Sequence, residues 1–145
     1  MLDLDHNHIS CTEKISHLEK LQLLFLSWND ISVIEGLDDF VELKVMRLNY
    51  NKISRIEGLD ALINLEELGL DHNCISKIEN LDRLTKLQCL YLSSNEISAF
   101  EGLDTLIKLR ELWLVENPNA DLGVYRTKKA VNKARQQFDL HDRVP

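Results

Sequence analysis

The chain has few of the features that mark secreted or membrane proteins. Only three cysteines and two prolines occur among its 145 residues. An odd number of cysteines at irregular spacing argues against a disulfide scaffold and favours a reducing, intracellular compartment, most simply the cytoplasm. The chain also lacks the run of about 18 apolar residues that a membrane-spanning helix needs, and we expect no secretory leader.

Positive charge is scarce as well. The chain has 17 Lys and Arg against 24 Asp and Glu, a net charge of -7. That sign disfavours non-specific binding to nucleic acid or to an anionic membrane. Residues 118–145 carry six basic against three acidic side chains, a net of +3, which leaves -10 for residues 1–117. We interpret the basic segment as a solvated helix face, since it lacks the interleaved aromatics that stack on bases.

A 22-residue repeat dominates what the sequence does contain. Asparagine recurs at this interval at Asn7, Asn29, Asn51, Asn73, Asn95 and Asn117. Apolar residues stand three and five positions before each asparagine, and this alternation predicts a short strand. Apolar columns eight and eleven positions before it, the latter beginning at Leu18, suit tight helical turns. A single coil of this kind cannot bury its apolar edge, but stacked coils can.

The repeated asparagine is predicted to lie inside the stack as a ladder of amides. An amide offers two donors and an acceptor, which can satisfy backbone groups that have no strand partner. Gly36, Gly58 and Gly102, with Asn80 in the fourth unit, follow at a fixed spacing. These residue types tolerate a positive φ, so we expect a turn there.

The full motif is L-x-x-L-x-x-L-x-L-x-x-N-x-I-x-x-I-E-G-L-D. It resembles the 22-residue class of leucine-rich repeats, typified by a regulatory subunit of protein phosphatase 1. The resemblance implies an α/β solenoid: a right-handed superhelix with a parallel concave sheet, short helical turns on the convex side and a C-terminal capping helix. Residues 1–117 would form six repeat units and residues 118–145 the helical cap. Asn117-Pro118 and Tyr125-Arg126 resemble the family's cap.

The two ends depart from the central pattern. From Asp121 to about Phe138 the sequence predicts an amphipathic helix. Its expected apolar stripe is Leu122, Tyr125, Val131, Ala134 and Phe138. At the other end, Leu2 and Leu4 already belong to a repeat, with no capping helix before them. Three explanations stay open: a longer protein is truncated here, a partner covers this end, or the first coil is frayed.

Outward-facing strand positions have no role in the core, so their occupants are informative. Both tryptophans and two of the three tyrosines fall at such positions, on one predicted concave face. Exposed aromatics beside an arginine are typical of protein-binding hot spots. Gly69 would leave a notch among them. The predicted partner-binding residues are Phe25, Trp28, Arg47, Tyr50, Glu67, Tyr91, Glu111 and Trp113.

The family resemblance suggests which partner this face could hold. Glu111 and Trp113 form a Glu-x-Trp pair similar to one in the phosphatase regulator, and Phe25 and Glu67 match more weakly. The resemblance therefore implies a non-enzymatic regulator that holds a phosphatase catalytic subunit. Two alternatives stay open: an axonemal scaffold that docks on dynein in a cilium, and a nuclear, spliceosomal-type protein that pairs with an RNA-binding domain.

Other chemistry finds little support. Asp3-x-Asp5-x-Asn7 begins like a calcium loop, but it lacks the central glycine and has Lys14 at the twelfth position. We expect His6 and His72, three repeats apart, to be solvated rather than metal ligands. The sequence offers Cys11, Cys74 and Cys89 no base in register, and it contains no phosphate-binding loop. We therefore expect no metal, no cofactor and no catalytic residue.

Overall fold

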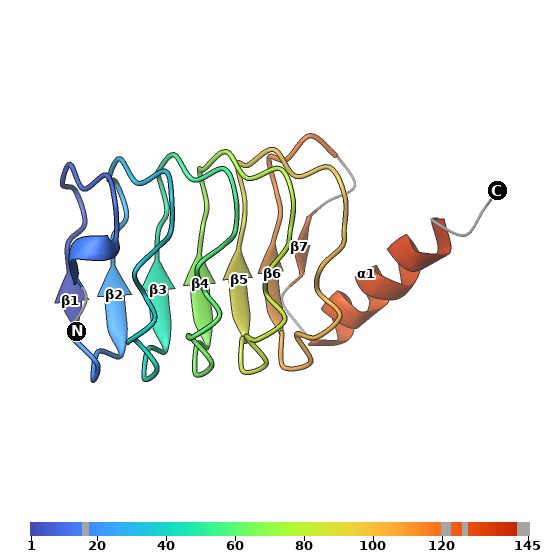
Figure 1. Ribbon diagram of the computed structural model, residues 1–145. Helices are drawn as coiled ribbons and strands as arrows, with labels where there is room; N and C mark the ends of the chain where they lie inside the picture. Colours follow the sequence, from blue (N-terminus) through green and yellow to red (C-terminus); the bar gives the residue numbers. More distant parts are fainter. Residues whose placement is uncertain (16–17, 120–122, 126–127, 142–145) are drawn as a thin grey trace.

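The computed structural model describes residues 1–15, 18–119, 123–125 and 128–141. Seven short strands form one sheet in chain order and make up one wall of the molecule (Figure 1). They are β1 (Leu2–Asp3), β2 (Leu23–Phe25), β3 (Val45–Arg47), β4 (Glu67–Gly69), β5 (Cys89–Tyr91), β6 (Glu111–Trp113) and β7 (Val124–Tyr125).

The first six strands are parallel, and each pairs with the next at a register of 22 residues. Met46 of β3, for example, lies opposite Leu68 of β4, which lies opposite Leu90 of β5. The pairing continues past the strands, since the Leu26 N–H donates to the Arg47 carbonyl at 2.8 Å. The predicted parallel-sheet solenoid, with one strand in each repeat, is therefore confirmed.

The wall opposite the sheet consists of turns rather than helices. In the second repeat, the Phe40 N–H donates to the Leu37 carbonyl, and the Leu43 N–H donates to the Phe40 carbonyl. These bonds begin three residues apart and do not overlap, so they make separate turns instead of a continuous helix. Among the described residues of this wall, a helical turn occurs only at η1, Glu13–Ile15. The expected helical turn in every repeat is not seen there.

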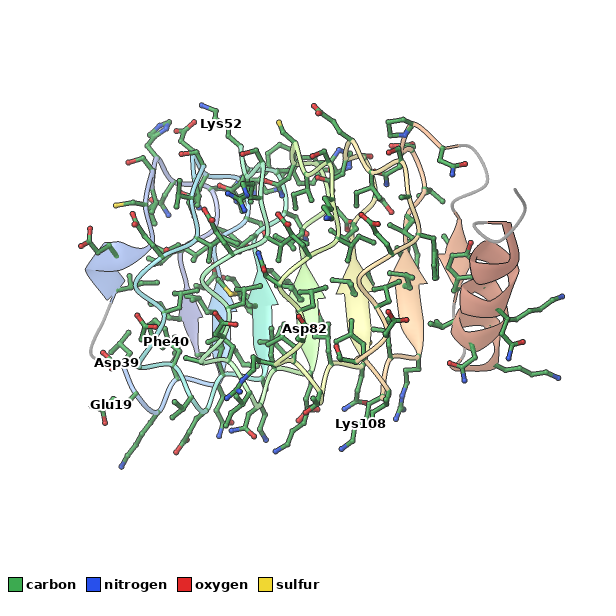
Figure 2. The ribbon with its side chains drawn as sticks, turned by 45° about the vertical axis from the view of Figure 1, so that its right-hand side comes forward. Glu19, Asp39, Phe40, Lys52, Asp82 and Lys108 are labelled. Carbon is green, nitrogen blue, oxygen red and sulfur yellow. The ribbon has the colours of Figure 1, made fainter. Side chains whose placement is uncertain are left out.

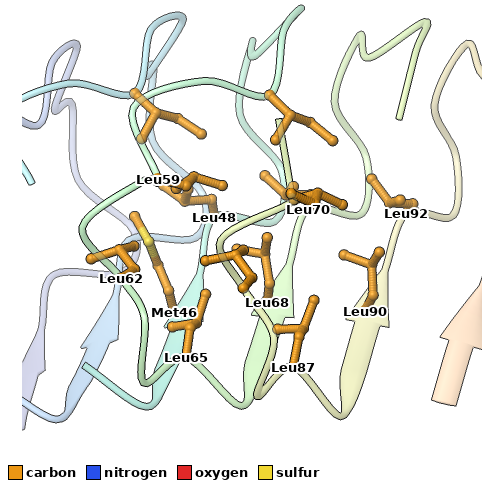
Figure 3. Packing of buried hydrophobic residues seen from close by; sticks show 14 of the residues in the cluster. Met46, Leu48, Leu59, Leu62, Leu65, Leu68, Leu70, Leu87, Leu90 and Leu92 are labelled. Atoms are coloured by element: carbon orange, nitrogen blue, oxygen red, sulfur yellow. The ribbon is translucent and has the colours of Figure 1, made fainter. Parts of the chain in front are cut away.

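Leucine and isoleucine columns fill the space between the two walls (Figure 3). Leu62 and Leu65 of the third coil and Leu68 and Leu70 of the fourth are all fully buried. Leu18 is an exception: it belongs to the same column as Leu62, yet 45% of its surface is exposed. Leu18 is less buried than the rest of its column because the first coil has a neighbouring coil on one side only.

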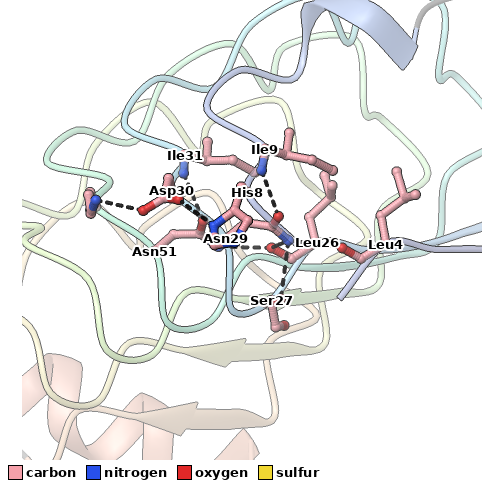
Figure 4. Close-up of polar contacts among 10 residues, drawn as sticks. Leu4, His8, Ile9, Leu26, Ser27, Asn29, Asp30, Ile31 and Asn51 are labelled. Carbon is pink, nitrogen blue, oxygen red and sulfur yellow. Dashed lines mark hydrogen bonds and ion pairs between the residues drawn. The ribbon is translucent and has the colours of Figure 1, made fainter. Parts of the chain in front are cut away.

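The repeated asparagines join neighbouring coils (Figure 4). The Asn29 amide donates to the Leu26 carbonyl of its own coil at 3.1 Å and to the Leu4 carbonyl of the preceding coil at 2.9 Å. Its Oδ1 accepts the Ile9 N–H at 2.9 Å. Asn51, Asn73, Asn95 and Asn117 repeat this pattern one coil later each time. One side chain thus satisfies donors and acceptors of two coils.

In most repeats a glycine follows the ladder asparagine, at a point where the backbone of the preceding coil lies close. Gly58 has a φ of 69°, and a Cβ placed on it would collide with the Ile34 carbonyl of the preceding coil. Asn80 takes the equivalent place in the fourth repeat, with a φ of 57°. The turn at this spacing has the positive φ that the sequence predicts.

The C-terminal segment differs from its prediction in part. Val124 and Tyr125 form β7, which runs antiparallel to β6 and covers its open edge. The helix α1 spans Lys128–His141 and begins later than expected, with Val131 and Ala134 buried. Tyr125 is therefore a strand residue and not part of the helix. The predicted positions Leu122 and Arg126 lie outside the described residues, as does the side chain of Phe138. No helix in the described segments has the length and apolar character to cross a membrane.

The amide ladder yields a prediction about stability. Asn73→Ala should lower the free energy of unfolding by about 2 to 4 kcal/mol, because the Ile53 N–H and the Leu48 carbonyl lose their partner while buried. Asn7→Ala is the matched control: Asn7 is exposed and bonds only its own coil, so the loss should stay below about 1 kcal/mol. Urea denaturation measures both. Equal losses for the two variants would show that the ladder does not hold the coils together.

Candidate functional site

Side chains at the outer positions of the strands stand on the sheet face, which is the surface of the sheet that points away from the core. Charged side chains elsewhere also extend outward, as Glu19 and Lys108 do, whereas Phe40 is buried (Figure 2). The middle row of the sheet face is aligned by the strand register. It consists of Asp3, Phe25, Arg47, Gly69, Tyr91 and Trp113.

Arg47 is held from two sides. Its guanidinium carbon lies 5.1 Å from the centre of the Phe25 ring, close enough for a cation–π contact. Its Nε donates to Glu67 Oε1 at 2.9 Å, and a second guanidinium nitrogen lies 2.9 Å from the same oxygen. Glu67 therefore forms an ion pair with Arg47, and the three predicted binding residues form one contact group.

Tyr91, Glu111 and Trp113 form a second group on β5 and β6. The Tyr91 and Trp113 rings meet edge to face, with centroids 6.0 Å apart. The Tyr91 hydroxyl donates to Glu111 Oε2 at 3.4 Å. Burial raises the pKa of the Tyr91 hydroxyl, and neighbouring Cys89 and acidic side chains raise it further. Tyr91 thus remains a neutral donor. Burial and Glu111 also raise the pKa of the Cys89 thiol, which disfavours a reactive thiolate.

A shallow hollow of about 300 Å³ lies between these two groups. Gly69 does not leave the empty notch that the sequence predicts, because the Asn49 amide lies against it. A Cβ at Gly69 would come within 2.9 Å of Asn49 Oδ1, so only glycine lets the amide lie there. Asn49 Oδ1 in turn accepts the Asp71 N–H at 2.9 Å. The hollow is lined by Arg47, Asn49, Glu67, Asp71, Tyr91 and Trp113.

Asp71 is the acidic residue of the hollow that was not among the predicted binding residues. Its Oδ1 accepts the Ser93 N–H at 2.7 Å. Burial raises the pKa of the Asp71 carboxyl, although the Ser93 N–H and the nearby His72 act in the opposite direction. Asn49, one coil earlier, makes the same backbone contact with a neutral amide. In the sequence, Asp or Asn recurs two positions before the ladder asparagine, at Asp5, Asn49 and Asp71. This recurrence is the signal that could have identified Asp71.

The remaining predicted aromatics form a separate stack where the strands end. The ring centroids of Trp28 and Tyr50 are 3.8 Å apart, and those of Tyr50 and His72 are 4.0 Å apart. His6 stacks on the other side of Trp28 at 5.5 Å. All four residues have φ between 54° and 58°, which turns the chain out of the strand. His6 and His72 are thus exposed but stacked, not simply solvated. The predicted aromatic face therefore comprises this stack, the Tyr91–Trp113 pair and Phe25 beside Arg47.

The described part of the chain holds no cluster of three His, Cys, Asp or Glu side chains arranged to bind a metal ion. Cys11, Cys74 and Cys89 are free thiols. The sheet face presents aromatic rings, carboxylates and an arginine that is paired with a carboxylate.

The raised pKa of Asp71 leads to a prediction about pH. A carboxyl with a raised pKa in the folded state stabilises the fold less as pH rises above its ordinary value of 3.8. Asp71→Asn should keep the contact with the Ser93 N–H and remove this pH-dependent loss of stability. We expect a gain of about 0.5 kcal/mol at neutral pH, small because solvent screens the half-buried group. The gain should vanish below pH 3.8.

Urea denaturation at several pH values measures the difference between this variant and the wild type. Comparing the two proteins at each pH removes the contribution of the other carboxyl groups. A variant that is less stable than the wild type at neutral pH would show that the Asp71 charge helps to hold the fold.

Comparisons with known proteins agree with this architecture. Residues 41–83 match the family model described as Leucine Rich repeats (2 copies). An internalin (inlF) from Listeria monocytogenes is similar, with 31% identity and a TM-score of 0.74 over 80% of this chain and 34% of that one. TLR13, solved in a complex with ssRNA13, shares 28% identity with a TM-score of 0.71 over 81% of this chain and 19% of that one.

A third similar structure is the functional domain of InlJ from Listeria monocytogenes. Its identity of 24% and TM-score of 0.61, over 70% of this chain and 22% of that one, bear on the fold alone. The chain thus spans about a third of the internalin and about a fifth of the other two chains. No curated protein matches it significantly. Residues 41–83 thus match leucine-rich repeats, and the chain folds as a parallel-sheet solenoid similar to the internalin structure.

Proposed function

We propose that this chain is a non-enzymatic module that binds a protein partner on its sheet face. In this proposal the solenoid is right-handed, the sheet face is concave, and α1 closes the C-terminal end of the stack. Leucine-rich-repeat folds are typical of protein–protein interaction modules. The single observation that carries the proposal is the set of aromatic and charged side chains at strand positions that the core does not use.

The energetics of such a surface support protein binding. Large aromatics and arginine supply most of the binding energy at protein interfaces, because they bury much area with few rotatable bonds. Trp28 and Tyr50 keep 49% and 37% of their surface exposed although each stacks on its neighbours. A partner that covered these rings would gain their hydrophobic burial without having to order them first.

A phosphatase catalytic subunit is the first candidate partner. The support is the Glu-x-Trp pair: Glu111 and Trp113 both stand on the sheet face of β6, and both contact Tyr91. The charge balance argues against nucleic acid as the partner, because residues 1–117 carry a net charge of -10. The ssRNA in the TLR13 complex therefore gives no reason to propose RNA as the partner of this chain.

Affinity purification with mass spectrometry tests this function. Phe25→Ala combined with Trp113→Ala should abolish recovery of the partner, because the variant removes a ring from each contact group of the sheet face. Val41→Ala combined with Ile107→Ala is the control, since both residues are exposed and apolar but lie in the turns between strands. Circular dichroism checks that all variants remain folded.

The identity of the recovered protein decides between partners. Loss of a phosphatase catalytic subunit with the double variant, but not with the control, is the expected result. Recovery of dynein or tubulin would replace the phosphatase with an axonemal partner, and recovery of an RNA-binding protein would indicate a spliceosomal one. A double variant that keeps every partner of the wild type would rule out the sheet face as the binding surface.

A further inference from the structure

We infer that the hollow around Asp71 receives the side chain of one arginine from the partner. The inference rests on the proposed function, since the hollow lies on the sheet face. It goes further by naming the chemical group that is recognised. Three features of the hollow carry it: its charge, its aromatic wall and its size.

The charge of the hollow is negative once its internal ion pair is counted. Arg47 and Glu67 neutralise each other at 2.9 Å. Asp71 then remains as the uncompensated charge among the lining residues. Its Oδ1 accepts the Ser93 N–H, while its other oxygen accepts no hydrogen bond from any described residue. Glu111, on the neighbouring strand β6, adds a second carboxylate close to Tyr91. A cation is the ligand charge that this arrangement favours.

The aromatic wall selects among cations. Tyr91 and Trp113 both line the hollow, and their rings meet edge to face. A guanidinium group stacks on aromatic faces and pairs with a carboxylate through two parallel hydrogen bonds. An ammonium group is more strongly hydrated and pairs as a point charge, so it gains less from the same surroundings. The combination of rings and a carboxylate therefore favours arginine over lysine.

The size of the hollow suits one side chain rather than a larger ligand. Its volume of about 300 Å³ is at the lower end of the range for ligand pockets, which run from about 300 to 1,000 Å³.

The Ser93 hydroxyl is buried next to Asp71 and has no hydrogen-bond partner among the described residues. A polar group beside Asp71 thus lacks a hydrogen-bond partner within the described residues.

In the free protein the charge of Asp71 lowers the stability of the fold, and a bound cation would offset this loss. Burial disfavours the charged form of Asp71, as its raised pKa shows. The fold does not need that charge, because Asn49 makes the equivalent backbone contact one coil earlier. A carboxylate where an amide would serve is explained if an incoming guanidinium pairs with it.

Titration with N-acetyl-arginine amide, followed by amide NMR of the whole chain, tests the inference. We expect millimolar binding with shifts centred on Gly69, Asp71 and the Trp113 indole. Asp71→Asn should weaken this binding about tenfold, because the charge-assisted bonds are lost. Asp5→Asn is the matched control: Asp5 makes the same backbone contact, to Ser27, but lies outside the hollow. The corresponding citrulline amide, uncharged and of the same shape, should bind far more weakly.

Each other outcome overturns the inference. Equal binding of the citrulline amide would show that charge is not recognised. Equal weakening by Asp5→Asn and Asp71→Asn would indicate diffuse attraction to an acidic protein. The absence of shifts at the hollow would exclude it as the site. Tighter binding of N-acetyl-lysine amide than of the arginine probe would contradict the choice of guanidinium.

The partner assay separates this inference from the proposed function. If Phe25→Ala with Trp113→Ala loses the partner while Asp71→Asn binds it as tightly as the wild type, the sheet face binds without an arginine in the hollow. If the double variant keeps the partner, the proposed function fails. A partner lost with both variants but retained with Asp5→Asn is the result expected if both proposals hold.

Discussion

The amide of the repeated asparagine is the interaction on which the other features of the structure depend. Asn51 donates to the Leu48 carbonyl of its own coil and the Leu26 carbonyl of the coil before, and it accepts the Ile31 N–H. Because one side chain serves two coils at once, every coil must bring the same groups to the same place. This requirement holds the repeat at 22 residues and sets the strand register that aligns Met46 with Leu68.

The same register creates the columns on the sheet face. Residues 22 apart in the sequence become neighbours in space, so a side chain type that recurs at that spacing contacts its own kind. Trp28 and Tyr50 stack at 3.8 Å for this reason. Asn49 and Asp71 are linked in the same way, the side chain of the first accepting the backbone N–H of the second. The 22-residue register of the strands thus determines which residues of the sheet face are neighbours.

Sequence periodicity was sufficient to predict the strands, their parallel order and the core columns, because these follow from a spacing that every repeat shares. Periodicity was not sufficient at the two ends of the stack, where a coil has a neighbouring coil on one side only. Leu18 matches its column but is exposed, and Tyr125 pairs with β6 instead of joining a helix. It also could not show that Asn49 fills the space above Gly69, since side-chain placement depends on contacts between coils that a single repeat does not encode.

A solenoid is well suited to carry a group that costs stability. Each coil contacts only its neighbours, so a local loss at one coil does not propagate through a shared central core. Asp71 lies in the fourth coil, where the flanking ladder amides of Asn73 and Asn95 are both fully bonded. The stability lost through its half-buried charge is therefore offset by contacts that do not involve the sheet face. Residues on that face therefore differ from coil to coil, while the inward leucines and the asparagine ladder recur in each coil.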